Sequence, residues 1–571
     1  MRRHHILIPL AALLAILPLI LHGCSCGHDF DFHLQSWLDA AQQMRHGTLY
    51  PRWAFSAAYS AGEPRFLFYP PLSWTLGALL TLLFSIELAP FLVTFLALCG
   101  AGFAMYRLAR EFVAENAALL AAVLYLANPY MLFNAFERTA YAELLAATWI
   151  PLLFLAVLRK RLRIAGIAVP LALLWLTNAP AAVMGTYAFA LLGSVRLWLE
   201  WRQTRVLPLR LLGICIAGFA LGMALPAFYL VPAAYERRYV QIAMAIIPNM
   251  RVQDNFLFGH TANAGHNLVL HTASLLAASL LAVTFVAAAV LALRRDEADR
   301  ALRFTMLGIT VLIGLLLVPV STPVWLHVPE MAFLQFPWRL MTILSAVLGL
   351  TVALLLSGRV ERHGIVLGVG LACPVVLSLL CIHLYRQRCE RVDLPASVAL
   401  AFRTHHGVGP TDEYTPAQAD NDFLRADDPA YWLSTDPQAF AAGTVPNPAA
   451  TDPNYDSDEV PADTLSAQAP QHWTLELPRP LFVVLNLRDF ADWRVTVNGN
   501  AVTARVQRDD GLMAFALPSG ASTVDIRWRY GWDQELGFAV SGVALVLLGF
   551  AWHREQGKGR GWVEEADRLR G

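Results

Sequence analysis

Repeated long apolar runs constrain the fold of this chain more than any other feature. The length of each run is within, or close to, the range of about 17–25 residues that a helix needs to cross a bilayer. They lie at 6–21, 88–106, 117–130, 144–158, 164–176, 181–199, 211–231, 273–293, 304–320, 340–356, 365–384 and 536–552. With 57% hydrophobic and 15% charged residues, the sequence is too apolar for a soluble globular protein. It predicts a polytopic α-helical membrane protein with about 12 transmembrane helices.

The placement of Lys and Arg predicts the orientation of these helices. Basic residues (MRRHH) precede the first run, and cytoplasmic loops are enriched in Lys and Arg. A further apolar stretch lies at 72–86. If this stretch also crossed, the basic cluster at 159–163 and the arginines after it would lie outside. We therefore expect 72–86 to be an interfacial or re-entrant helix, and both chain ends to be cytoplasmic.

This topology divides the chain into four parts. Residues 1–386 form a transmembrane bundle with a large first outer loop at 24–87, and residues 387–533 form an extracytoplasmic domain. A last transmembrane helix at 534–552 and a cytoplasmic tail at 553–571 follow. From about residue 472, short alternating runs are separated by turn residues such as Asn498-Gly499, a pattern typical of a small antiparallel β-sandwich.

The first outer loop opens with a cluster of ionisable residues, HDFDFH, directly after the first apolar run. Asp29, Asp31, His28 and His33 lie within six residues at the membrane boundary. Ionisable groups beside a bilayer are costly unless they are solvated or paired, so the cluster is a functional-site hypothesis. A plain polar loop is the alternative. The rest of the loop is rich in aromatic residues, Arg and Pro, and we expect it to be structured and to lie on the outer surface.

The seven cysteines are too few and too scattered for a disulfide scaffold or a metal cluster. Four fall inside apolar runs and are interpreted as packing residues. Cys24 and Cys26 form a CxC pattern at the outer end of the first helix, and Cys389 follows the last run of the bundle. Whether any of these three form a disulfide is left open by the sequence.

The order of these features resembles the GT-C superfamily of polyprenyl-phosphate-dependent glycosyltransferases. Within it, the elements HDFDFHL, YPRW, FLFYPPLS, ERTAYAE and LQFPWR resemble those of bacterial membrane proteins named after a 6-pyruvoyl-tetrahydropterin-synthase-related domain. The tail with FADWRVTVNGN is similar to that of YfhO-type proteins. The synthase name implies no pterin chemistry here. The resemblance implies a GT-C-like bundle in a bacterial cytoplasmic (inner) membrane.

The resemblance also implies roles for particular residues. Asp29 occupies the position of the general base, with Asp31 as second choice and His33 as a group that would orient either carboxylate. The guanidinium of Arg339 in QFPWR suits a lipid phosphate at the interface, because it binds phosphate oxygens in a bidentate manner and keeps its charge. Further phosphate- or substrate-binding candidates are Arg52, Glu137, Arg138 and Glu143. The second acidic motif is not DxD, so no metal ligand is assigned, and a divalent metal is left open.

The function implied is transfer of a sugar from a polyprenyl-phosphate carrier to an envelope glycan or lipid acceptor on the outer face of the membrane. The implied partners are the lipid-linked sugar, membrane lipids and that acceptor, while a net charge of zero gives no reason to expect nucleic acid. Two alternatives remain. The chain would be a non-catalytic membrane assembly protein, or a transporter or flippase of lipid-linked sugars, although charges within the spans, which a transport path needs, are nearly absent.

Overall fold

The computed structural model describes residues 4–294, 300–360, 363–404, 407–426, 428–441 and 471–568, with side chains for all of these except 4, 363 and 556–568. The tail predicted at 553–571 therefore extends past the described residues. The helices are α1 (His4–Ala15), α2 (Leu17–His22), α3 (Phe30–Arg45), α4 (Arg65–Phe68), α5 (Pro71–Leu83), α6 (Ala89–Ala109), α7 (Glu115–Leu126), α8 (Pro129–Phe136), α9 (Tyr141–Ala146), α10 (Trp149–Leu158), α11 (Ile164–Thr177), α12 (Ala179–Thr204), α13 (Leu209–Ala224), α14 (Ala227–Glu236), α15 (Ala264–Ala292), α16 (Arg300–Leu316), α17 (Thr322–His327), the 3-10 turn η6 (Pro337–Leu340), α18 (Met341–Leu356), α19 (His363–Tyr385), α20 (Pro395–Arg403) and α21 (Trp532–Arg568). The strands are β1 (Tyr431–Ser434), β2 (His472–Leu477), β3 (Leu481–Arg488), β4 (Trp493–Val497), β5 (Asn500–Ala501), β6 (Leu512–Leu517) and β7 (Gly520–Trp528).

The predicted polytopic helical architecture is confirmed. Among the described residues, eight helical segments are long and apolar enough to cross a membrane, or ten if the bent pairs α13–α14 and α16–α17 each count as one. The predicted runs at 6–21 and 164–176 correspond to the shorter apolar helices α1 and α11. The first run is interrupted before α2, where Pro18 stands in the first turn, because proline has no N–H to continue the ladder of α1.

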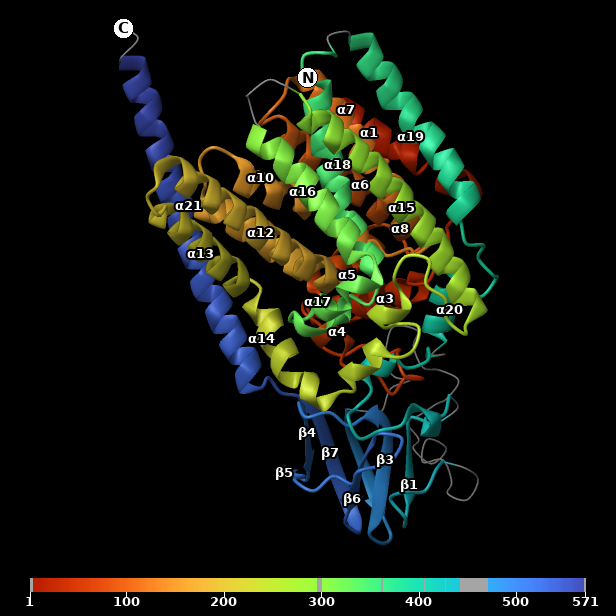
Figure 1. The fold of residues 1–571 in the computed structure, drawn as a ribbon. Helices are drawn as coiled ribbons and strands as arrows, with labels where there is room; N and C mark the ends of the chain where they lie inside the picture. Colours follow the sequence, from red (N-terminus) through yellow and green to blue (C-terminus); the bar gives the residue numbers. More distant parts are fainter. Residues whose placement is uncertain are drawn as a thin grey trace.

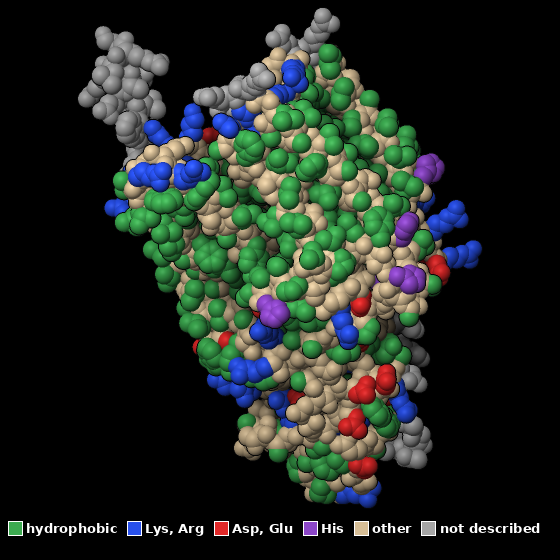
Figure 2. All heavy atoms as spheres, in the orientation of Figure 1, with side chains coloured by type: hydrophobic (Ala, Val, Ile, Leu, Met, Phe, Trp, Pro, Cys, Tyr) green, Lys and Arg blue, Asp and Glu red, His purple; other side chains and the backbone are tan. Residues whose placement is uncertain are grey.

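The helices and strands occupy opposite ends of the molecule. Figure 1 shows both chain termini at one end of the helical bundle and the β-strands beyond the other end, where α14 and α21 reach them. Apolar side chains cover the visible face of the bundle; Lys and Arg lie toward both ends of the molecule, whereas most visible Asp and Glu lie in the half that carries the strands (Figure 2).

The strands form two antiparallel sheets with the orders β1-β3-β6 and β2-β7-β4-β5. Their inward side chains share one apolar core, which includes Val483 and Leu485 of β3 and Val524 and Ile526 of β7. This arrangement is the predicted sandwich. β1 lies before residue 472, where the alternating pattern begins, and it is joined to β3 only by long-range pairing.

The first outer loop does not lie exposed on the surface as expected, because the sandwich covers it. Nearly every residue of the segment 51–67 is buried. Trp53 is only 2% exposed and packs edge-on against Trp493 of β4. The Asn486 amide of β3 donates a hydrogen bond to the Tyr59 carbonyl, at 3.2 Å. The aromatic residues of the loop are thus core residues between the bundle and the sandwich.

A buried polar junction joins the sandwich to the last helix. The Gln534 amide of α21 donates to the carboxylates of Glu236 in α14 and Asp492 before β4. Asp492 is 9% exposed. Its burial, followed by the nearby Asp533 carboxylate, raises the pKa of Asp492 to about 6. Because the folded state binds this proton more tightly than the unfolded chain, Asp492 stabilises the fold at low pH and loses that effect as the pH rises from about 4 to about 6.

We therefore expect Asp492→Asn to stabilise the protein at pH 7.5, by about 2 °C in the thermal midpoint, and much less at pH 5. Asparagine keeps an oxygen for Gln534 and carries no charge into the buried junction. The measurement is thermal unfolding of the purified protein in detergent at both pH values. Glu476→Gln, an exposed change in β2, is the matched control. Equal midpoints for Asp492→Asn and wild type at pH 7.5 would contradict this account.

Candidate active site

A buried ion pair between Arg138 and Glu143 forms the centre of the candidate site. The two residues follow α8 and start α9, and the chain reverses between them at Thr139, which has a φ of 49°. A non-glycine residue in this left-handed region is strained and is common at functional sites. The reversal brings the Arg138 Nη1 to 2.6 Å from the Glu143 Oε2, with side chains only 6% and 2% exposed.

Arg339 reaches the same carboxylate from a different part of the chain. It lies in η6, just before α18, and its Nε is 3.4 Å from the Glu143 Oε2. Its Nη1 donates to the Leu334 carbonyl at 2.9 Å and to the Gln335 side chain at 3.2 Å. The Arg339 Nε has no hydrogen-bond acceptor although it is buried. One carboxylate is therefore shared by two buried guanidinium groups.

Asp29 approaches this cluster from the start of α3. Its backbone N–H donates to the Arg138 carbonyl at 3.0 Å, and its Oδ2 is 3.9 Å from the Arg138 Nη2. The close approach requires a glycine at position 27, because a Cβ there would lie 2.2 Å from the Glu137 carbonyl oxygen. The Asp29 side chain is 43% exposed, so it is the carboxylate of the cluster that a ligand can reach.

The buried part of the cluster carries an excess of positive charge. Arg138 and Arg339 bring two positive charges against the single buried carboxylate of Glu143. Although burial alone would lower the pKa of the Arg138 guanidinium, the Glu143 and Asp29 carboxylates raise it overall, so Arg138 stays charged. Such a site attracts an anion, and the natural ligand of paired guanidinium groups is a phosphate or carboxylate.

The other predicted site residues lie around the cluster or away from it. The His33 ring is buried among aromatic rings, and burial lowers its pKa to about 4, so it is neutral at physiological pH. Asp31 is exposed and about 200° around α3 from Asp29, on the side of Asp393. The Glu137 carboxylate accepts from the Gln387 amide at 2.8 Å, and the ion pairs of Arg138 and Arg339 are made with other carboxylates.

Arg52 lies in a different place altogether. Its guanidinium stacks at 4.2 Å over the ring of Tyr50 and also faces the rings of Tyr530 and Phe538, at the junction with α21. The structure therefore does not bring Arg52 together with the other candidates. Among the described residues, no group of three or more His, Cys, Asp or Glu side chains has the geometry of a metal site.

An apolar groove lies further along the helices that carry the cluster. It has a volume of about 290 Å³ and is lined by residues of α7, α15, α18 and α19 and of the start of α8. On α18 the lining residues are Ser345, Leu348, Gly349 and Val352, which lie about 9–20 Å along the helix from Arg339. The same helices therefore carry an anion-attracting cluster and, further along, an apolar groove.

Comparison with known families identifies the chain. The family model described as "6-pyruvoyl-tetrahydropterin synthase related domain; membrane protein" matches residues 66–386, more than half of the sequence. The chain belongs to this family. The resemblance predicted from the outer-loop motifs is therefore confirmed. Arg138, Glu143 and Arg339 lie inside the matched range of this PTPS-related protein, whereas Asp29 precedes it.

Three solved structures are similar to the PTPS-related protein at low identity. A mutant of arabinofuranosyltransferase AftD from Mycobacteria has 18% identity and a TM-score of 0.40, over 68% of this chain and 28% of its own. ArnT from Cupriavidus metallidurans, bound to undecaprenyl phosphate, has 14% sequence identity and a TM-score of 0.37, and the match covers 70% of each chain. The Archaeoglobus fulgidus oligosaccharyltransferase has 11% sequence identity and a TM-score of 0.36, and the match covers 70% of this chain and 58% of its own. These neighbours are members of the GT-C superfamily, and this chain spans less than a third of the AftD chain. No curated protein matches the sequence.

Sequence reasoning missed three polar residues of the PTPS-related site. The Tyr130 hydroxyl donates to the Glu143 Oε1 at 2.5 Å, and the Thr342 hydroxyl does so at 3.3 Å. Asn134 accepts from the Arg138 Nη1 at 3.0 Å. Tyr130 and Asn134 are spaced by four residues on one face of α8, and Arg138 follows the end of that helix after four more, so this spacing was the available signal.

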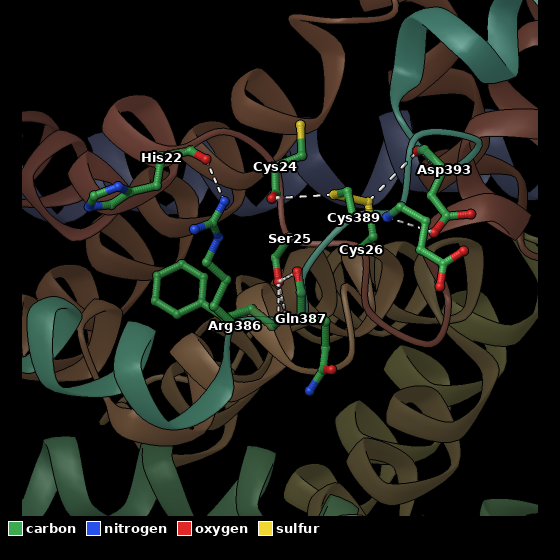
Figure 3. Close-up of a disulfide and its surroundings, with 10 residues drawn as sticks. His22, Cys24, Ser25, Cys26, Arg386, Gln387, Cys389 and Asp393 are labelled. Carbon is green, nitrogen blue, oxygen red and sulfur yellow. Dashed lines mark hydrogen bonds between the residues drawn. A yellow bond between two sulfur atoms is a disulfide. The ribbon is translucent and has the colours of Figure 1, made fainter.

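A disulfide between Cys26 and Cys389 fastens the segment that carries Asp29 (Figure 3). Next to it, the Ser25 hydroxyl donates to the Phe136 carbonyl at 2.5 Å and accepts from the Gln387 backbone N–H at 2.9 Å. The bridge answers the question that the sequence left open: Cys24 is the free member of the three. Three distant parts of the chain are thus joined within a few residues of Asp29.

We expect a thiol count to detect this bridge. The denatured protein should take up five molecules of a maleimide-linked polymer without reduction and seven after reduction, because five of its seven cysteines are free. The measurement is the stepwise gel shift of protein purified from the membrane. Cys24→Ser should remove one step from both samples. Seven adducts without reduction would contradict the bridge.

Proposed function

We propose that this PTPS-related protein transfers a sugar from a polyprenyl-phosphate carrier to a hydroxyl group of an envelope glycan or lipid on the outer face of the membrane. The observation that carries the proposal is the shared Glu143 carboxylate between Arg138 and Arg339. Within the buried part of the cluster, two guanidinium groups share this one carboxylate, the half-exposed Asp29 supplies the other negative charge at 3.9 Å from Arg138, and the Arg339 Nε has no hydrogen-bond acceptor. A lipid phosphate would give the Arg339 Nε an acceptor and both guanidinium groups a further negative partner.

The apolar groove supports a carrier with a long tail. It lies on the same helices as the cluster, with Pro129 next to Tyr130 on α8 and Ser345 one turn beyond Thr342 on α18. An isoprenoid tail would enter the groove while its phosphate remained at Arg339. A soluble nucleotide sugar has no such tail, so the combination of charged cluster and apolar groove favours the lipid-linked donor.

In the proposed reaction, the acceptor oxygen attacks the anomeric carbon of the sugar, and the bond between that carbon and the phosphate oxygen breaks. Asp29 accepts the hydroxyl proton as general base, since its side chain is accessible and is 3.9 Å from Arg138. The polyprenyl phosphate leaves with the electron pair, and Arg138 and Arg339 stabilise the negative charge that develops on it. His33, which is neutral and buried, contacts the rings beside Asp29 and has a positioning role at most.

A deletion strain tests this function. Loss of the enzyme should cause one polyprenyl-phosphate-linked sugar to accumulate in lipid extracts and one glycan or lipid modification to disappear, both measured by mass spectrometry. Wild-type protein should restore both, and an inactive site variant of equal expression should restore neither. Unchanged lipid and glycan profiles in the deletion strain would contradict the proposal. A variant that lacks the carboxylates of Asp29, Asp31 and Glu143 and still restores both profiles would favour a non-catalytic assembly protein.

The proposed topology places the cluster and the sandwich outside and both termini in the cytoplasm of a bacterial inner membrane. Residues 387–533 then form an extracytoplasmic domain, and α5 does not cross the bilayer. We expect a membrane-impermeant thiol reagent to label Glu476→Cys in intact cells and to label Arg210→Cys only after the membrane is opened. Both positions are exposed. The opposite pattern would place the cluster in the cytoplasm and contradict the proposed donor.

A further inference from the structure

A second groove lies between α12 and α16, at the end of the bundle that carries the chain termini. It has a volume of about 870 Å³ and is lined by side chains of these two helices. Both helices pack against α18. The groove is therefore the gap between two helices that share one neighbour, and it is separate from the groove beside the candidate active site.

The charge of this groove is concentrated at one end. Arg202, near the end of α12, and Arg300, at the start of α16, are both exposed lining residues. The Arg202 guanidinium lies 4.9 Å over the ring of Trp198, and that of Arg300 lies 5.8 Å over the ring of Phe304. Among the described residues, which exclude 295–299, no carboxylate lines the groove. Stacking holds the two guanidinium groups at the rim and leaves their N–H edges available to an anion.

The rest of the groove is mainly apolar, with Gln203 and Thr305 as its other polar lining residues. From the arginines it continues to Leu191 on α12 and Leu312 on α16, about 17–18 Å along each helix. This length is close to the about 15 Å thickness of one leaflet of the hydrocarbon core. At Gly308 an added Cβ would meet no atom within 4 Å, so the groove is unfilled there.

We propose that this groove binds an anionic phospholipid of the inner leaflet, with its phosphate between Arg202 and Arg300 and an acyl chain along α16. Two features support this proposal: two cations lie at the level of the headgroups, and the apolar groove is about as long as one leaflet is thick. The inner-leaflet assignment rests on the topology proposed above. Binding itself does not depend on the proposed glycosyl transfer, and its test needs no activity.

Native mass spectrometry of the purified full-length protein tests the proposal. The protein is titrated with phosphatidylglycerol and with phosphatidylcholine of the same chain length. We expect tighter binding of phosphatidylglycerol, and a loss of about tenfold or more of that affinity in Arg202→Gln/Arg300→Gln. Gly308→Leu, which fills the groove and is favourable in a helix, should weaken the binding of both lipids in the groove. Arg205→Gln/Arg210→Gln removes the same charge at the same end outside the groove and should bind phosphatidylglycerol as wild type does.

Three results would overturn the proposal. The first is equal affinity for the two phospholipids in wild type. The second is an equal loss of affinity in the groove double variant and its control, which would indicate a general charge effect. The third is displacement of phosphatidylglycerol by polyprenyl phosphate but not by another anionic phospholipid, which would assign the groove to the carrier.

Discussion

Asp29→Asn lowers the rate of glycosyl transfer by about 10²–10⁴-fold, if Asp29 is the general base of the proposed reaction. The substitution keeps the size of the side chain and removes its ability to accept the proton of the acceptor hydroxyl. The backbone N–H of residue 29, which fixes the start of α3 against the Arg138 carbonyl, is unchanged. Folding and binding of the lipid phosphate should therefore be retained. The measurement is turnover of the lipid-linked sugar that the deletion strain accumulates, in membranes with matched expression.

Asp31→Asn is the matched control for this prediction. Asp31 is two residues away, also acidic and exposed, but its side chain is on the other side of α3. Its loss should leave turnover within a few fold of wild type. A large loss in Asp31→Asn with full activity in Asp29→Asn would move the base to Asp31.

Glu143→Gln destabilises the protein by about 3–5 kcal/mol, the usual cost of removing one partner from a buried ion pair. Without the carboxylate, the guanidinium groups of Arg138 and Arg339 remain buried near each other with no buried counter-charge. An anionic ligand should then compensate more strongly than in wild type. We expect polyprenyl phosphate to raise the unfolding midpoint of Glu143→Gln by more than it raises that of wild type.

Glu137→Gln is the matched control, because it removes a buried carboxyl group that is bonded to Gln387 and not to Arg138 or Arg339. Burial raises the pKa of the Glu137 carboxyl, and its hydrogen bond from Gln387 can also be accepted by a glutamine oxygen. The change should cost less than about 1 kcal/mol. The measurement is unfolding in mixed micelles with and without the lipid phosphate. Equal stability of the Glu143 and Glu137 variants would contradict the role of Glu143 as the shared counter-charge.

The motifs of the outer loops predicted candidate residues in segments that are far apart in the sequence. Asp29, Arg138, Glu143 and Arg339 come from three separate parts of the chain, and the structure brings them together. The resemblance to a family placed them at the same end of the spans, and the positive-inside rule placed that end outside. The ion pairs themselves were not predictable, because they depend on the chain reversal at Thr139 and on the packing of η6.

Arg52 and His33 show where residue type alone is insufficient. Both are polar residues in the outer loop, yet the Arg52 guanidinium packs on the aromatic rings of Tyr50 and Phe538, and the His33 ring is enclosed by aromatic residues. The distant partners, Phe538 for Arg52 and Tyr141 for His33, could not be predicted from positions in the sequence. Composition predicted that the loop is structured. It did not predict that the loop is buried between the bundle and the sandwich, which follows from long-range contacts such as that of Trp53 with Trp493.

In the proposed enzyme, Arg138, Arg339 and Glu143 hold the phosphate of a polyprenyl carrier beside Asp29. The most direct test is a cryo-electron microscopy structure of the purified protein in nanodiscs that contain polyprenyl phosphate. The predicted result is a phosphate within hydrogen-bond distance of Arg339 and Arg138, with tail density in the groove along Ser345 and Leu348. A phosphate bound elsewhere, with the cluster unchanged and the groove empty, would contradict this role of the cluster.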